Sequence, residues 1–580
     1  MSGRNWIGDA PGWIAAGAML VVAGCATRAS DPAATDVSTN GAAAVSSPLG
    51  SYLAARHAQE VHDYSSAAGF MEKALADDPG NLDLVRRTFS LRVSEGKVAE
   101  AVPLAQRIVG LDGNNGLAAT VLLVEDIKAG HYDAALQRTK ALPPEGAQRF
   151  AIPLLAAWMD AALGRPADAH QVLAQMGDLK GLDPLRELHT ALIADYVNDV
   201  PAAQTAYEKL ISGEAQPTFR VVELAGNFFE RHGMADRAKA LYARFASESD
   251  QADSSTLGLA RIAAGTIPAK LVDTPQKGAA EALFDLASLL NQRETMDASL
   301  IYARLALELE PNFALAQLLA GEIRDDQGRT ADALALYIAV DPHSSLYWSA
   351  RLRAALALDQ LDKTDEAEAI LRQLAAERPN AIEPLVELGD VLRGHEQYQE
   401  AATVYDQAIQ RQKTGDEDTW RLYYDRGVSL ERSGRWPLAE ADLKHALELA
   451  PQEPLVLNYL GYSWIDKGEN LNDALRMIQR AVELRPNDGY IVDSLGWAYY
   501  RMGDLAKATQ YLERAIELMP EDPTINDHLG DVYWRTGRLV EARSQWRRAL
   551  QFGPDAGDAK VIETKLDRGL DKAPQAMSGG

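Results

Sequence analysis

Two stretches near the C-terminal end of the 580-residue chain decide its fold: LGWAYYRMGDLAKATQYLERAIELMP at 495–520 and LGDVYWRTGRLVEARSQWRRALQFGP at 529–554. They begin 34 residues apart and share one skeleton: Leu-Gly, an aromatic residue three positions after the glycine, two alanines seven apart, and a closing proline. Glycine and alanine let two helices cross closely, and proline ends the second helix. Each stretch therefore indicates a helix pair with a fixed crossing point.

The same marks recur along the chain. Glycines and prolines repeat at intervals of 34 or 35 residues, at Gly427, Gly461, Gly496 and Gly530, and at Pro451, Pro486, Pro520 and Pro554. Towards the N-terminus only alanines keep the interval of 34, at Ala101, Ala135, Ala169 and Ala203. This period resembles that of the tetratricopeptide repeat. The resemblance implies an all-α protein, a right-handed superhelical solenoid of about thirteen tetratricopeptide-type helix pairs with a C-terminal capping helix.

The strength of the repeat marks divides the chain into segments. Gly265, Pro268, Pro275 and Gly278 interrupt one helical pattern, and Val561, Ile562, Leu566 and Leu570 give a terminal segment helical spacing. We expect N-terminal degenerate repeats at 48–249, an irregular hinge or degenerate repeat at 250–279, middle repeats at 280–419, regular C-terminal repeats at 420–556, a capping helix at 557–570 and a disordered tail at 571–580.

The N-terminal sequence has a pattern typical of an export signal. Residues 13–24, WIAAGAMLVVAG, are apolar or small and end at Cys25, the only cysteine of the chain. As a helix this stretch rises ~18 Å, too short for a ~30 Å hydrocarbon core, so we expect a cleaved signal peptide over 1–24. The alternative to lipidation at Cys25 is an ordinary signal peptide with a chance cysteine.

The residues before the cysteine, Val22-Ala23-Gly24-Cys25, resemble the bacterial lipobox. The resemblance implies that Cys25 becomes the first mature residue and carries the lipid that anchors the protein to a membrane. Residues 25–47 then form the lipidated cysteine and a flexible tether, rich in Ala, Ser and Thr. Ala26, in place of aspartate, implies the outer membrane, with the protein facing the periplasm.

Composition and motifs argue against several functions. The formal net charge of −25 is unfavourable for nucleic acid, whose phosphates repel an acidic surface. No phosphate-binding loop, dinucleotide fingerprint, HExxH or GxSxG motif occurs, and the only cysteine belongs to the anchor. His57 and His62 are five residues apart and would point to different faces of a helix. We expect no catalytic residue, no metal site and no cofactor, hence no enzyme.

Solenoids of this type bind partners on the inner face formed by the first helices of their repeats. Positions 5, 9, 12 and 13 of repeats starting at 420, 454, 489 and 523 should face it. Aromatic residues and arginine dominate protein interfaces. The predicted partner-binding residues at these positions are Tyr424, Tyr462, Trp497, Tyr500, Arg501, Trp534 and Arg535. Trp464, Tyr499 and Tyr533 occupy packing positions and are expected in the core.

Residues 460–515 and 528–550, with the lipobox and the chain length, resemble the tetratricopeptide outer-membrane lipoproteins of Gram-negative bacteria. That family includes the lipoprotein adaptor of a periplasmic carboxyl-terminal processing protease. The resemblance implies an adaptor that holds the protease and delivers peptidoglycan hydrolases to it. The alternative in the same binding class is a scaffold for polysaccharide export or secretin assembly at the outer membrane. A remote alternative is an enzyme in a degenerate repeat such as 250–279.

Overall fold

The computed structural model describes residues 47–60, 63–112, 115–142, 146, 148–178, 182–213, 216–248, 255–412 and 419–570. Over these residues the chain forms 30 α-helices and one short 3-10 helix, with no strand among them. None of these helices has the length and apolar character needed to cross a bilayer. The predicted signal peptide, Cys25 and the tail at 571–580 lie outside the described residues.

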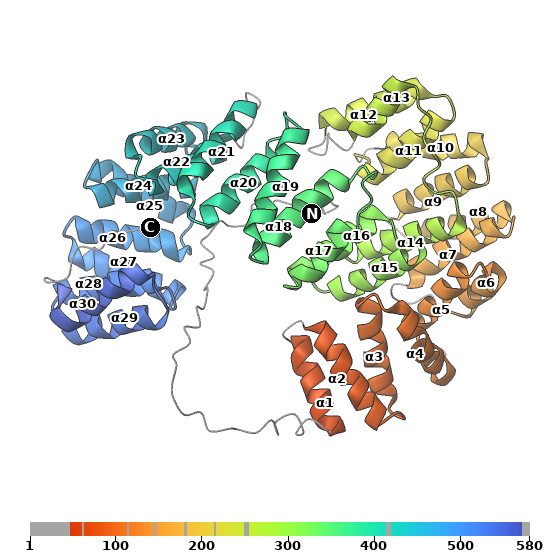
Figure 1. The fold of residues 1–580 in the computed structure, drawn as a ribbon, viewed down its shortest axis with the longest axis horizontal. Helices are drawn as coiled ribbons and strands as arrows, with labels where there is room; N and C mark the ends of the chain where they lie inside the picture. The colour runs from red at the N-terminus through yellow and green to blue at the C-terminus, as the bar shows by residue number, and fades with distance from the viewer. Residues whose placement is uncertain are drawn as a thin grey trace. The chain divides into compact units, whose positions relative to one another are not determined.

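The chain divides into two compact units, unit 1 ending at Ala367 and unit 2 beginning at Glu368 (Figure 1). The helices of unit 1 are α1 (Pro48–Glu60), α2 (Tyr64–Asp77), α3 (Leu82–Ser94), α4 (Val98–Leu111), α5 (Gly116–Lys128), α6 (Tyr132–Ala141), α7 (Gln148–Ala162), α8 (Pro166–Ala174), η2 (Gln175–Asp178), α9 (Asp183–Tyr196), α10 (Val200–Ile211), α11 (Phe219–Arg231), α12 (Ala235–Glu248), α13 (Thr256–Ala264), α14 (Pro275–Leu289), α15 (Met296–Leu309), α16 (Ala314–Asp326), α17 (Thr330–Ile338) and α18 (Tyr347–Gln360). Helix α19 (Thr364–Glu377) contains the boundary.

The helices of unit 2 are α20 (Glu383–Gly394), α21 (Tyr398–Arg411), α22 (Thr419–Arg432), α23 (Trp436–Leu449), α24 (Pro454–Lys467), α25 (Leu471–Leu484), α26 (Gly489–Arg501), α27 (Leu505–Leu518), α28 (Pro523–Arg535), α29 (Leu539–Gln551) and α30 (Ala556–Arg568). From α20 to α29 they pack in consecutive pairs. The inner face of unit 2 is defined here as the side of α22, α24, α26 and α28 on which the predicted partner-binding residues lie.

The repeat glycines lie where the two helices of a pair meet. A Cβ atom on Gly496 would lie 2.6 Å from Leu512 Cγ, and one on Gly530 would lie 2.5 Å from Trp546 Cδ1. Such distances leave no room for a methyl group, so the close crossing requires glycine at these positions. The alanines at 101, 135, 169 and 203 are fully buried. The predicted role of these small residues is confirmed.

The turn inside each regular repeat also depends on glycine. Gly503 and Gly537 follow the first helices α26 and α28 with φ of +84° and +81°. An L-residue pays a steric cost in this left-handed region, whereas glycine does not. These glycines let the second helix of each pair fold back within three residues.

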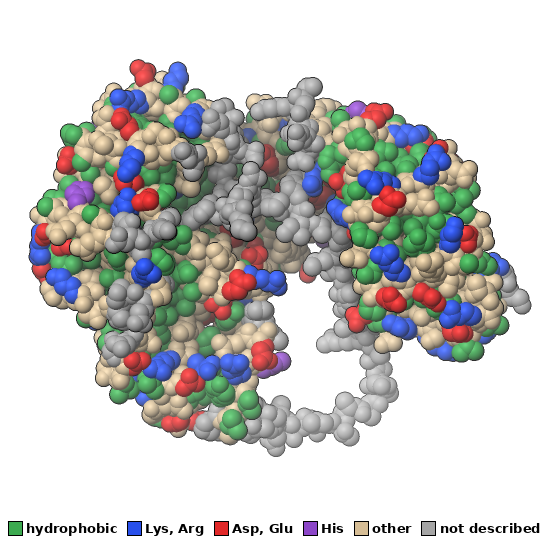
Figure 2. Space-filling model, turned by 180° about the vertical axis from the view of Figure 1, so that it is seen from behind, with side chains coloured by type: hydrophobic (Ala, Val, Ile, Leu, Met, Phe, Trp, Pro, Cys, Tyr) green, Lys and Arg blue, Asp and Glu red, His purple; other side chains and the backbone are tan. Residues whose placement is uncertain are grey.

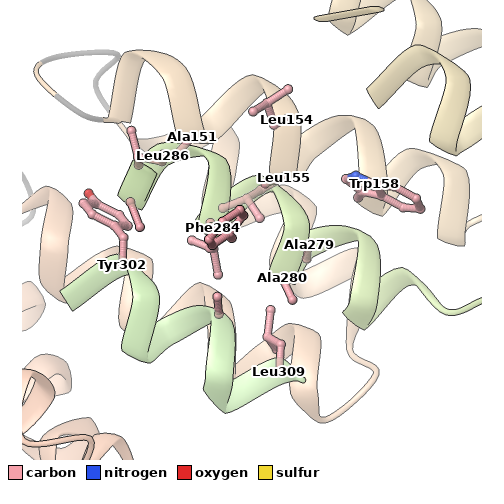
Figure 3. Packing of buried hydrophobic residues seen from close by; sticks show 14 of the residues in the cluster. Ala151, Leu154, Leu155, Trp158, Ala279, Ala280, Phe284, Leu286, Tyr302 and Leu309 are labelled. Atoms are coloured by element: carbon pink, nitrogen blue, oxygen red, sulfur yellow. The ribbon is translucent and has the colours of Figure 1, made fainter. Parts of the chain in front are cut away.

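Unit 1 closes on itself. Helix α14 packs against α5, α7 and α9, and α15 packs against α3 and α5 (Figure 1). Figure 3 shows Ala279, Ala280 and Phe284 of α14 packed between α7 and α15. Later helices thus cover the side of α3, α5, α7 and α9 that would otherwise form an open inner face.

Polar contacts fix this closure. Arg324 of α16 is 1% exposed and donates to the Ser94 carbonyl at 2.6 Å and to Glu95 at 3.1 Å. Arg329 also pairs with Glu95. A buried ion pair that lost one partner would leave an uncompensated charge, so these contacts disfavour opening of the unit.

The predicted hinge or degenerate repeat at 250–279 contains α13, a non-helical stretch and the start of α14. Gly265 ends α13 with φ of +65°. Asn227 then donates to the Ala269 carbonyl at 2.8 Å, and Lys270 donates to the Asp195 carbonyl at 2.6 Å. The non-helical stretch is therefore attached to α11 and α9; its role as a hinge stays a prediction.

Candidate protein-binding face

Two predicted tyrosines lie half-buried on the inner face of unit 2. Tyr424 of α22 packs edge-on against Tyr459, with ring centroids 5.8 Å apart. Burial and the neighbouring Asp425 raise the pKa of Tyr424. Burial and Asp493 likewise raise the pKa of Tyr462 on α24. Both phenols therefore stay protonated at neutral pH and keep their hydrogen-bond donors.

Trp497 and Tyr500 of α26 belong to an aromatic stack. The rings of Trp497 and Tyr500 lie 4.9 Å apart at 26°, and Trp497 also stacks on His528 of α28 at 4.0 Å and 15°. His528 Nδ1 lies 2.9 Å from Asp493 Oδ2. Burial alone would lower the pKa of His528, but the charge and hydrogen bond of Asp493 outweigh it and raise that pKa. The stack therefore places an imidazole whose protonated form Asp493 favours next to a carboxylate.

Trp534 has a packing role that the sequence did not predict. Its ring lies 5.4 Å from Trp546 and directly against Gly569, where an added Cβ would approach the indole to 2.4 Å. Gly569 follows the last helix, α30, so α30 covers Trp534 from one side. Replacement of Trp534 would therefore disturb the cap as well as any bound partner.

The two predicted arginines are exposed at the ends of α26 and α28. Arg501 pairs with Asp466 of α24 at 3.2 Å. Arg535 hydrogen-bonds the Tyr500 hydroxyl. Exposed pairs of this kind contribute little to stability, so both arginines stay available to a partner's carboxylate at small cost. The partner-binding role of all seven residues stays a prediction.

The residues expected in the core are buried. Trp464, Tyr499 and Tyr533 are 6 to 7% exposed. Their polar atoms reach the surface: the Trp464 indole donates to Glu440 at 3.0 Å, and the Tyr533 hydroxyl donates to Glu513 at 2.8 Å. The assignment of these three aromatic residues to packing is confirmed.

One functional feature escaped the sequence analysis, a buried lysine on the capping helix. Lys565 of α30 has a 4% exposed side chain and contacts Asp527 at 2.6 Å and Asp531 at 2.9 Å, both on α28. Trp546 also donates its indole N–H to Asp531 at 3.0 Å. The sequence shows only that Lys565 lies on the same side of its helix as Ile562 and Leu566, and it does not mark the aspartates that meet the ammonium group.

Potential metal ligands are scattered over the described part of the chain. No group of three or more His, Cys, Asp and Glu side chains there has a metal-binding arrangement. His57 is exposed on α1, and His62 lies outside the described residues. Acidic and basic side chains are interspersed on the side of the molecule seen in Figure 2. This mixed surface differs from the basic stripe typical of nucleic-acid binding.

Comparison with known proteins identifies the repeat. A tetratricopeptide repeat model matches residues 386–454, 466–523 and 494–559, and a second model of the same description matches 349–381. Residues 349–559 therefore carry tetratricopeptide repeats. The prediction of an all-α solenoid of tetratricopeptide-type helix pairs is confirmed. Repeats of this type form protein-interaction scaffolds.

Similar proteins share this feature over part of their length. The TPR repeat-containing protein PA4667 of Pseudomonas aeruginosa is 31% identical over 192 residues, 33% of this chain and 32% of that protein. The tetratricopeptide repeat-containing protein trd-1 of Caenorhabditis elegans is 28% identical over 205 residues, 35% of this chain and 24% of that protein. The matched region thus spans a third or less of each relative.

Among solved structures, the APC/C hetero-tetramer Cut9-Hcn1 aligns over 91% of this chain and 98% of its own chain, with 17% identity and a TM-score of 0.37. A tetratricopeptide repeat protein from Parabacteroides merdae aligns over 43% and 96%, with 15% identity and a TM-score of 0.37.

Proposed function

We propose that this protein is a lipid-anchored periplasmic adaptor that binds other proteins and delivers peptidoglycan hydrolases to a carboxyl-terminal processing protease. The observation that carries the binding role is the aromatic inner face of unit 2, where Tyr462, Trp497 and Tyr500 keep part of their surface exposed. Half-buried aromatic side chains on rigid helices make strong interface anchors, because little entropy is lost when they bind.

The anchor and the compartment rest on the N-terminal sequence. The apolar stretch ends at Cys25, and the preceding Val-Ala-Gly is compatible with cleavage before a lipidated cysteine. Two acyl chains anchor a protein stably, so a single modified residue suffices to hold the solenoid at the outer membrane.

The binding test compares two kinds of tyrosine substitution. Tyr462→Ala and Tyr500→Ala remove inner-face rings, whereas Tyr511→Ala removes a half-buried ring from the second helix α27. Capture of the processing protease from cross-linked envelopes should fall with the inner-face double variant and persist with Tyr511→Ala. Equal capture by all variants would remove this face as the docking site.

The adaptor role has its own measurement. Deletion of the gene should raise the level of at least one periplasmic cell-wall hydrolase in quantitative proteomics, and deletion of the processing protease should raise the same one. Unchanged hydrolases in both strains would exclude the adaptor and leave the export or secretin scaffold as the alternative.

A further inference from the structure

The inner face of unit 2 already holds one cation from its own chain. Lys565 of α30 is almost fully buried against α28 and is held by Asp527 and Asp531. A lysine survives burial only where carboxylates replace its hydration. This contact shows which side-chain chemistry the end of the inner face accepts.

Around Lys565 carboxylates outnumber the basic groups. The carboxylates near this cation and His528, on α26, α28 and α30 and at the N-cap of α28, are Asp493, Asp522, Asp527, Asp531 and Asp558. Burial and repulsion from Asp527 raise the pKa of Asp531 to about 7, against the opposing effect of Lys565. Burial and Asp527 likewise raise the pKa of Asp558. Five carboxylates thus lie near two basic groups, Lys565 and His528.

Hydrogen-bonding capacity also remains unused on this face. Asp527 Oδ1, Trp497 Nε1 and Asn458 Oδ1 are buried without a hydrogen-bond partner in the described part of the chain. Asn458 and Asp527 occupy the same position in their repeats, on α24 and α28, and Trp497 lies on α26 between them. Asp527 Oδ1 and Asn458 Oδ1 are acceptors that a cation of the ligand could satisfy, whereas the Trp497 N–H is a donor and needs an acceptor such as a backbone carbonyl of the bound segment.

An organic cation fits the unpartnered carboxylate oxygen and the aromatic faces of this surface. The described residues contain no arrangement fit for a metal ion. Ammonium and guanidinium groups bind carboxylates through several N–H donors and also pack on aromatic faces. Tyr462 and Trp497 supply such faces beside Asp493.

We propose that the inner face of α24, α26 and α28, bordered by α30, binds a partner segment that presents a lysine or arginine, with the cation between Asp527 and Asp558 and its aliphatic stem on Trp497. The proposal rests on the proposed protein-binding role and specifies the chemistry of the bound segment. Asp558 lies half-buried on the first turn of α30, seven residues before Lys565 and therefore on the same side of that helix.

The test uses the full chain and a phage-displayed library of random dodecapeptides. Peptides selected on the wild-type protein are sequenced, synthesised and measured by calorimetry. Asp558→Lys reverses a charge at the proposed site, and Glu563→Lys makes the same change at an exposed position of the same helix. A third variant, Asp527→Asn, removes the carboxylate charge at the proposed site.

We expect selected peptides to share a lysine or arginine at one position. Their affinity should fall about tenfold or more with Asp558→Lys and Asp527→Asn, and with norleucine in place of the peptide lysine, but not with Glu563→Lys. Selected peptides without a common cation, equal losses with both lysine variants, or selection of no peptide would overturn the proposal. Selection of apolar or acidic peptides whose binding depends on Tyr462 would refute the proposed recognition of a cation. It would leave the proposed protein-binding role of the inner face intact.

Discussion

Trp158 provides the sharpest test of how unit 1 closes. Its side chain is fully buried on α7, and its ring lies directly against Gly278 of α14, where an added Cβ would approach to 2.3 Å. The indole N–H donates to His189 Nδ1 of α9 at 2.9 Å, which leaves His189 Nε2 to donate to Asp285 Oδ2 of α14 at 3.0 Å. One side chain therefore joins three helices that lie far apart in the sequence.

Trp158→Phe keeps an apolar ring and deletes the N–H. The unpaired nitrogen of buried His189 costs about 1–3 kcal/mol, and the smaller ring leaves a cavity worth on the order of 1 kcal/mol. The expected loss is about 2–4 kcal/mol, against a total of about 5–15 kcal/mol for a typical domain. Trp158→Ala should lower the free energy of unfolding by about 3–5 kcal/mol through lost packing, and the unpaired His189 nitrogen adds its own cost. Together these losses bring unit 1 close to unfolding.

Hydrogen exchange measured by mass spectrometry reports this opening locally. Amide protection over α14 (Pro275–Leu289) should fall about 30- to 1,000-fold in Trp158→Phe, because each 1.4 kcal/mol is a factor of ten. Trp436→Phe is the control: it deletes an indole N–H that donates to Glu469 at 3.3 Å in unit 2. Unchanged amide protection of α14 in Trp158→Phe would refute the reasoning that this ring keeps α14 packed against α7 and α9.

Three further predictions concern the anchor, the helix crossings and pH. Cys25→Ser should abolish metabolic labelling with palmitate and release the protein from membrane fractions; a variant that kept its label would exclude lipidation at Cys25. Gly530→Ala should destabilise unit 2 by about 1–2 kcal/mol in urea unfolding, since overpacking outweighs the gain in helix propensity, whereas Gly69→Ala, with open space around the helix, should stabilise by about 0.5–1 kcal/mol. Because Asp493 raises the pKa of His528 in the folded state, the stabilisation from His528 is complete below pH ~6.5 and is lost as pH rises through the raised value. The urea midpoint of unit 2 should therefore fall as pH rises above ~6.5, and His528→Gln should flatten that fall; a slope equal to wild type would show that another group titrates.

Much of this protein could be predicted because tetratricopeptide packing is local in sequence. Gly496 meets Leu512 and Gly530 meets Trp546, pairs 16 residues apart, so the 34-residue marks directly encode the helix crossings. The burial of Tyr499 and Tyr533 follows from the same marks. In a solenoid each repeat contacts mainly its neighbours, and a repeating sequence therefore specifies its own core.

The sequence predicted which residues lie on the inner face, but it did not predict which side chains surround them. Their repeat positions place Trp497 and Trp534 on first helices, as expected. The stacking of Trp497 on His528 and the cover of α30 over Trp534 depend on side-chain directions and on the path of the last helix. The position of a residue within its repeat therefore does not predict the stacking on His528 or the cover by α30.

Tertiary structure alone decided the closure of unit 1 and the burial of Lys565. The contact between Trp158 and Gly278 joins residues 120 apart, and the one between Arg324 and Glu95 joins residues 229 apart. Such contacts depend on the small rotation between successive repeats, which accumulates over many helices and leaves no periodic mark in the sequence. Lys565 is buried for the same kind of reason: a lysine looks solvent-exposed in a sequence until the fold brings Asp527 and Asp531 to its ammonium group.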